Sequence, residues 1–187
     1  IDKPDNIRKI HKKPVALAGG TLIFLNTLIF WLLINFHNEL LENEILFKNN
    51  NSFNSFILIS CSIFLLGFFD DKLNISANKK FLVSTIIILI LIYIDPGILL
   101  NNIKFSFYEK NFILNNYKVF FSVFCFLVFL NAFNMFDGIN LQSSSYSIFI
   151  FLCISIFFID TLLIKILLIS LISFSYLNYK NKAFLGD

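Results

Sequence analysis

The chain has 187 residues, of which 57% are hydrophobic and only 14% are charged, with a net charge of +3. This composition and a mean hydropathy of +0.78 are too apolar for a water-soluble domain of this length, so they exclude a soluble enzyme and give no reason to expect a nucleic-acid partner. We therefore predict an integral membrane protein.

Uncharged apolar segments follow one another along the chain, each separated from the next by a polar stretch. They cover residues 17–36, 53–69, 81–94, 119–136, 141–159 and, less cleanly, 162–179. A helix of about 20 residues crosses roughly 30 Å of hydrocarbon, so we expect the third and sixth segments to be short and to need snorkelling Lys or Tyr side chains at their ends. The predicted fold is all-α: a polytopic transmembrane bundle of about six helices, forming a single integral membrane domain over residues 1–187.

The polar segment "DPGILLNNIKFSFYEKNFILNNYK" carries alternating apolar residues around Lys104–Phe107 and Phe112–Leu114. This alternation predicts a small β-hairpin between the third and fourth helices. All three cysteines lie inside apolar segments, where a small buried side chain is the usual explanation, and we assign them no role.

If the chain crosses the membrane at every apolar segment, residues 1–14, 70–80, 137–144 and 178–187 share one side, which we call the motif side. This side carries ten of the 15 basic residues: Lys3, Arg8, Lys9, Lys12, Lys13, Lys72, Lys79, Lys80, Lys180 and Lys182. The positive-inside rule then predicts that the motif side is cytoplasmic.

On the motif side, Asp70 and Asp71 directly follow an apolar segment in "GFFDDKLNISANKK". Mutual repulsion and partial desolvation disfavour two such charges, so we expect a divalent ion or lysines to offset them. Mg²⁺ suits carboxylate, amide and phosphate oxygens together. A single polar residue at a helix end simply meets water, but four polar segments gathered on one side indicate a site.

Four stretches of the chain, "DKPDNIRKIHKKPVALAGG", "GFFDDKLNISANKK", "NAFNMFDGIN" and "FLGD", resemble in this order the motifs of the polyprenyl-phosphate N-acetylhexosamine-1-phosphate transferases. The resemblance covers essentially the whole chain. It implies transfer of a sugar 1-phosphate, such as N-acetylglucosamine 1-phosphate, from a UDP-N-acetylhexosamine to a polyprenyl (undecaprenyl) phosphate, with release of UMP. The expected setting is the cytoplasmic face of the bacterial inner membrane, at the first membrane step of cell-envelope polysaccharide synthesis such as lipopolysaccharide.

The resemblance also implies roles for individual residues, Mg²⁺ (or Mn²⁺) as cofactor, and an assembly that is often a homodimer. The implied catalytic residues are Asp70, Asp71 and Asp137, the metal ligands Asn134 and Asp187, and the substrate-binding residues Arg8, His11, Lys80, Asn131 and Phe184, the last stacking on uracil. A phosphate monoester has a second pKa of about 6 and is mostly dianionic near neutrality. We therefore expect Asp70 and Asp71 to position metal, lysines and acceptor, rather than to act as a general base or to form a covalent intermediate.

The chain departs from the family pattern at two positions. "DGINL" has Asn140 where many members have a second Asp, and Ser84 stands where a Gln is common. Family members have more helices than this chain, so we expect a helix before Ile1 and several after Asp187, and we expect these residues alone to be inactive.

Other functions remain open from the sequence. The opening motif is closer to the N-acetylglucosamine branch than to the muramoyl-pentapeptide transferases of peptidoglycan synthesis, which are the first alternative. A transporter would place its polar residues near mid-bilayer on broken helices. A CDP-alcohol transferase needs an Asp where Asn134 stands. A purely structural membrane subunit is the remaining alternative.

Overall fold

The computed structural model describes residues 15–36, 50–73, 75–108, 110–137, 140–159 and 161–186. Its elements in chain order are β1 (Ala16–Leu17), α1 (Gly19–Phe36), α3 (Asn50–Leu73), α4 (Ala77–Ile94), β2 (Asn102–Ile103), β3 (Phe112–Ile113), α5 (Lys118–Phe136), α6 (Gln142–Phe157), α7 (Leu162–Tyr179) and β4 (Ala183–Phe184), with 3₁₀ turns at Pro96–Ile98 and Asn115–Tyr117. The predicted all-α bundle is confirmed, and six α-helices lie within the described ranges.

Five of the helices in the described part of the chain are long and apolar enough to cross a membrane, and α6 is shorter. The sixth segment is confirmed as α7 with the expected bounds, whereas the third is longer than expected, because α4 begins at Ala77 and has 18 residues. Lysine is a good helix former, so α4 extends through Lys79 and Lys80 in its first turns. The short helix is α6, with 16 residues, since Leu141 before it adopts the left-handed conformation at φ 68°.

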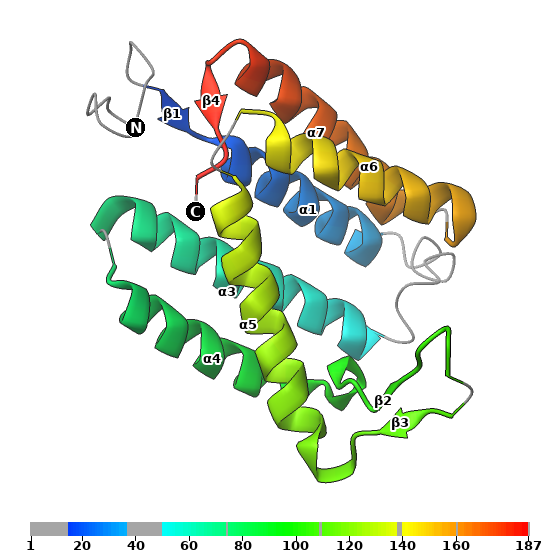
Figure 1. The fold of residues 1–187 in the computed structure, drawn as a ribbon. Coiled ribbons are helices and arrows are strands. Elements are labelled where there is room, and N and C mark those ends of the chain that lie inside the picture. The colour runs from blue at the N-terminus through cyan, green and yellow to red at the C-terminus, as the bar shows by residue number, and fades with distance from the viewer. Residues whose placement is uncertain are drawn as a thin grey trace.

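The helices run side by side except for α5, which crosses the others at a steep angle (Figure 1). Contacts join α1 to α3 and α7, α6 to α7, α3 to α4, and α4 to α5. Two small apolar cores hold the bundle together: Phe30, Ile34, Phe53, Ile57 and Leu163 in one, and Ile88, Ile92 and Leu127 in the other. Each membrane-length helix buries only a minority of its residues, as expected when lipid covers the rest.

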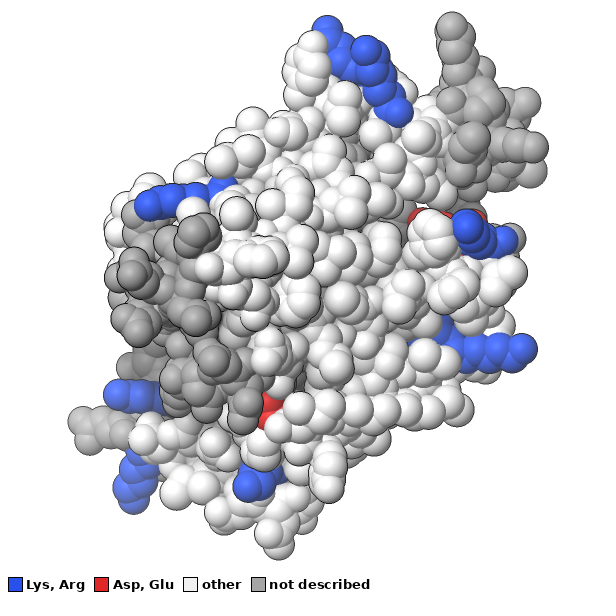
Figure 2. Space-filling model, turned by 180° about the vertical axis from the view of Figure 1, so that it is seen from behind, with Lys and Arg blue, Asp and Glu red and all other residues white. Residues whose placement is uncertain are grey.

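One face of the molecule carries its charged side chains away from the middle. Figure 2 shows Lys and Arg side chains toward the two ends of one face, with a broad uncharged band between them. Charged groups are costly within hydrocarbon, so this band matches the membrane-spanning part of the bundle.

At one end of the bundle, β1 and β4 form a parallel pair in which Ala16 faces Ala183 and Leu17 faces Phe184. Gly20 N–H donates to the Leu185 carbonyl at 2.8 Å. The pair therefore fastens the start of α1 to the segment that follows α7 (Figure 1). At the opposite end, β2 and β3 form an antiparallel hairpin, with Ile103 opposite Phe112. The second strand lies where it was predicted, but the first was wrongly placed, because β2 ends at Ile103 and residues 104–107 lead into the turn.

We expect Gly19→Ala to destabilise this end of the bundle. A Cβ atom at Gly19 would lie 2.3 Å from Cε2 of Phe174, a fully buried ring, and 2.9 Å from Cα of Leu185. Neither neighbour can move without disturbing the core or the β1–β4 pair, and overpacking costs about 1–3 kcal/mol. A lower midpoint of thermal unfolding in detergent measures the loss.

The adjacent Gly20→Ala is the matched control for this substitution. Its Cβ atom would meet only the Leu185 carbonyl oxygen, at 3.3 Å, so a small shift relieves the contact. Equal losses for the two variants would contradict the proposed packing of Gly19.

Candidate active site

The turn between α3 and α4 is closed by the Asp70 carboxylate. Its Oδ1 accepts the Ile75 N–H at 2.9 Å, and its Oδ2 pairs with Lys80 Nζ at 2.7 Å. A short connection makes neighbouring helices antiparallel, so Lys80, in the first turn of α4, returns to the last turns of α3. Asp70 is 11% and Lys80 22% exposed. The cation expected to offset the paired aspartates is therefore, for Asp70, the lysine ten residues later.

Asp71 faces a different element, the segment that follows β4. A Cβ atom at Gly186 would lie 2.6 Å from Asp71 Oδ2 and 3.6 Å from Leu17 Cβ. The Asp71 carboxylate therefore lies directly against the backbone of Gly186, the residue before Asp187 in the sequence. Residues more than a hundred positions apart meet at this point, at the end of the bundle where β1 pairs with β4.

The last turns of α5 carry the third group of predicted site residues. Asp137 caps the helix, and its carboxylate accepts a hydrogen bond from the Ser143 hydroxyl in the first turn of α6. Asn134 is exposed one turn earlier. Asn131 is exposed as well, and its Nδ2 donates to the Leu127 carbonyl of its own helix at 2.8 Å. Ser143 thus fixes Asp137, while Asn131 is turned toward its own helix.

A buried amide at the end of α7 connects two of these segments. Asn178 is 5% exposed; its Oδ1 accepts the Leu141 N–H at 2.7 Å and its Nδ2 donates to the Ala183 carbonyl at 2.9 Å. Asn140 Nδ2 donates to Asn181 Oδ1 beside it. The loop after α5 is therefore tied to the strand that leads to Gly186, and Asn140, which departs from the family pattern, takes part in this link.

The structure brings some of the predicted site residues together and leaves others apart. Lys80 contacts Asp70, and Asp71 contacts the Gly186 backbone next to Phe184 and Leu185. The hydrogen bond of Asn131 goes to the Leu127 carbonyl, and Leu127 is not one of the predicted site residues. Arg8, His11 and Asp187 lie outside the described residues, and their predicted roles stay predictions.

Sequence reasoning missed Ser143, Asn178 and Gly186. A serine or asparagine at the end of an apolar segment looks like any residue that meets water, so composition gave no signal for the first two. The "FLGD" motif contains Gly186, but only its φ of +81° and its contact with Asp71 show why a glycine is needed there.

The donors at this end suit a hard cation. Asp71 is a carboxylate placed against the residue that precedes Asp187, and Asn134 and Asp137 add amide and carboxylate oxygens at the end of α5, all of the oxygen type that Mg²⁺ prefers. Within the described ranges, no three His, Cys, Asp or Glu side chains gather into a preformed metal cluster. The donor chemistry fits Mg²⁺ held partly by substrate phosphates, as is usual for this ion.

A family model described as glycosyl transferase family 4 matches residues 53–187, which include the α3–α4 turn, the end of α5 and the segment around Gly186. The chain belongs to glycosyl transferase family 4. Among the curated relatives, an undecaprenyl-phosphate alpha-N-acetylglucosaminyl 1-phosphate transferase of Thermotoga maritima is 30% identical over 149 residues. The match covers 80% of this chain and 40% of the length of the relative.

Two further relatives carry similar names. A probable undecaprenyl-phosphate N-acetylglucosaminyl 1-phosphate transferase of Bacillus subtilis is 25% identical over 194 residues, covering 100% of this chain and 50% of its own. The Salmonella typhi undecaprenyl-phosphate alpha-N-acetylglucosaminyl 1-phosphate transferase is 24% identical over 139 residues, covering 74% of this chain and 34% of its own. The family 4 chain described here thus spans about half or less of the length of these relatives. No solved structure matches it.

Proposed function

We propose that this family 4 chain carries part of the active site of an enzyme that transfers N-acetylglucosamine 1-phosphate from UDP-N-acetylglucosamine to undecaprenyl phosphate and releases UMP. The observation that carries the proposal is the contact of Asp71 with Gly186 at the same end of the bundle as the Asp70–Lys80 pair. This contact gathers two family motifs at one rim of a membrane protein. The names of the relatives supply the sugar and the lipid.

In this proposal, the residues of the site bring two anionic substrates together. Lys80, which is held by Asp70 in the first turn of α4, presents a cation to the diphosphate or to the acceptor phosphate, as do Arg8 and His11 from the segment before β1. Phe184 of β4 offers a ring on which uracil can stack. Asp70 fixes the direction of the lysine and needs to remove no proton, because the acceptor phosphate is already mostly dianionic near pH 7.

Asp71, Asn134, Asp137 and Asp187 are the side chains that would hold a magnesium ion beside these groups. When bound, Mg²⁺ neutralises charge on the diphosphate and on the UMP leaving group. The chain's own contribution is to fix the oxygens: Ser143 orients Asp137, and the Gly186 backbone orients Asp71.

The location of this end of the bundle suits both substrates. A polyprenyl phosphate reaches the protein laterally through the bilayer, with its phosphate at the surface, whereas a UDP-sugar arrives from water. A site at the ends of α3, α4 and α5 is accessible to both. The excess of basic residues on this side supports a cytoplasmic orientation in the bacterial inner membrane.

The proposal is tested by incubating membranes that contain the full-length protein with labelled UDP-N-acetylglucosamine, Mg²⁺ and undecaprenyl phosphate. We expect UMP and a labelled lipid to form together, and neither to form when the lipid phosphate or the metal is left out. UDP-N-acetylmuramoyl-pentapeptide is the matched donor control. Product from that donor alone would overturn the sugar assignment, and uptake of label into vesicles without UMP would indicate a transporter instead.

A further inference from the structure

The end of the bundle opposite the candidate active site carries a feature that phosphosugar transfer does not use. It is the β2–β3 hairpin, which connects α4 to α5 and stands out from the bundle in Figure 1. The 18 residues of α4 rise about 27 Å at 1.5 Å per residue, which separates the hairpin from the Asp70–Lys80 pair by the length of that helix. A role for the hairpin is therefore independent of the reaction.

Four aromatic rings pack against one another on the hairpin. Phe105 stacks on Phe107 with centroids 5.3 Å apart and meets Phe112 edge-on at 5.7 Å, and Tyr108 stacks on Phe112 at 5.3 Å. Phe107 is nevertheless 86% exposed, and the other three rings are between 42% and 49% exposed. The rings thus form an apolar cluster that the described part of the bundle does not cover.

The strands of the hairpin are too short to stabilise it well by themselves. Its strands are two residues each, and an isolated two-stranded hairpin is marginally stable in water. Its base is attached to α5, because Ser122 Oγ accepts the Leu100 N–H at 2.9 Å. The two sides of the hairpin are joined at this base by the Leu114 N–H, which donates to the Asn101 carbonyl at 2.9 Å. Beyond this base, an environment that covers the rings would stabilise the hairpin.

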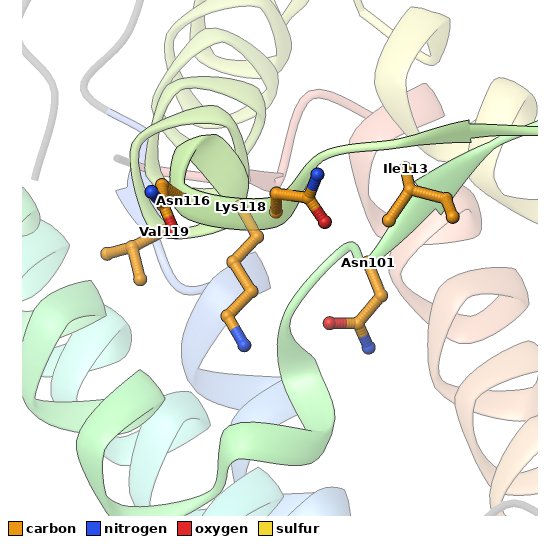
Figure 3. Close-up of a pocket in the computed structure, with 6 residues that line it drawn as sticks. Asn101, Ile113, Asn116, Lys118 and Val119 are labelled. Atoms are coloured by element: carbon orange, nitrogen blue, oxygen red, sulfur yellow. The ribbon is translucent and has the colours of Figure 1, made fainter.

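A hollow of about 540 Å³ lies at the base of the hairpin, lined by Asn101, Ile113, Asn115, Asn116, Lys118 and Val119. Figure 3 shows that the Lys118 and Asn101 side chains extend to the same side of this base. Lys104 and Lys110 lie within the hairpin segment. Amide and ammonium groups of this kind suit lipid phosphates and glycerol esters.

We infer that the β2–β3 hairpin is an interfacial anchor, whose ring cluster lies at the headgroup level of the bilayer on the side opposite the candidate active site. Short connections, each with a 3₁₀ turn, join the hairpin to α4 and α5. Both helices are of membrane-crossing length, so the base of the hairpin is at the membrane surface. Aromatic rings are favoured at this depth, and lysines beside them reach the phosphates.

A second copy of the chain is a less suitable partner for the cluster. Four aromatic side chains with about 200 Å² of surface each, roughly half exposed, could bury on the order of 400 Å² against a partner. A standard protein interface buries ~800 Å² of surface per partner, which is more. The bilayer needs no such minimum area, because it also covers the neighbouring exposed surfaces of α4 and α5.

The single tryptophan of the chain, Trp31, makes a direct depth measurement possible. In a full-length background in which Trp31 and every tryptophan outside these 187 residues are replaced by Phe, Phe107→Trp places one fluorescent ring in the cluster. Phe112→Trp is a second probe if the first does not fold. Each full-length variant is reconstituted into phosphatidylcholine vesicles whose lipids are brominated either near the headgroup or near the end of the acyl chain. Unsubstituted protein, with Trp31 in α1, is the control.

We expect blue-shifted emission that headgroup-proximal bromine quenches more than terminal bromine, with little quenching by aqueous iodide. Red-shifted emission that iodide quenches and brominated lipid does not would overturn the inference, because the hairpin would then project into water. Blue-shifted emission insensitive to both quenchers would also overturn it, since protein would then cover the cluster. Helicity measured by circular dichroism confirms that each variant is folded.

Discussion

Replacing Gly186 by alanine is expected to lower transferase activity by about 100-fold, the scale of effect that a displacement of roughly 1 Å has on a positioned group. The added Cβ atom would lie 2.6 Å from Asp71 Oδ2, and the φ of Gly186 is +81°. The strained backbone alone costs roughly 1–2 kcal/mol for a residue with a side chain. To relieve the steric contact and the backbone strain, Asp71 must move away from the segment that leads to Asp187.

The measurement for Gly186→Ala is UMP release as a function of Mg²⁺ concentration, which separates a displaced metal ligand from general destabilisation. We expect half-maximal activity to require more Mg²⁺ in the variant, whereas a protein that is only less stable loses activity at every concentration alike. Gly97→Ala is the control, because its Cβ atom would meet the Asp95 carboxylate, a flexible side chain, at 2.9 Å. Unchanged activity and metal dependence in Gly186→Ala would contradict a shared role for Asp71 and Asp187.

For Asp70→Asn, we expect on the order of 100-fold less activity at every pH where the enzyme works. An asparagine can still accept the Ile75 N–H, but it offers Lys80 an uncharged partner in place of a carboxylate. A hydrogen bond to a charged group contributes about 1.5–3 kcal/mol, so the lysine loses the contact that fixes its direction. The rate is followed against pH with saturating UDP-sugar.

The shape of that profile distinguishes positioning from proton removal. If Asp70 were a general base, the variant would lose rate mainly where the acceptor phosphate is protonated and would approach unsubstituted rates in alkali. Lys80→Gln should cause a similar loss, and the double variant little more than either single one, because both break the same pair. Asp95→Asn, which alters a carboxylate at the far end of α4, is expected to leave the rate unchanged.

The number and order of the helices in the described residues followed from the sequence, because apolar segments of membrane length are separated by polar stretches. Helix limits followed less well: α4 takes in Lys79 and Lys80, which interrupt the apolar pattern but not the helix. Alternation located the hairpin at Phe112 but placed its first strand around Lys104, one to two residues beyond β2.

The partners of the site residues could not be read from the sequence in the same way. The closeness of Asp70 and Lys80 is a consequence of a short turn, which a local pattern can suggest. The contact of Asp71 with Gly186 and the two bonds of Asn178 depend on how α1, α3 and α7 pack. No spacing along one segment encodes that packing, and the family motifs indicated only that the segments belong together.

The parallel pairing of β1 with β4 has a consequence for biosynthesis. Ala16 emerges from the ribosome before its partner Ala183, and synthesis at about 5–20 residues per second makes the delay between them roughly ten to thirty seconds. During that interval α1 is already made, but β1 before it has no strand to pair with. The end of the bundle that carries the candidate active site is therefore completed only once α7 has entered the membrane.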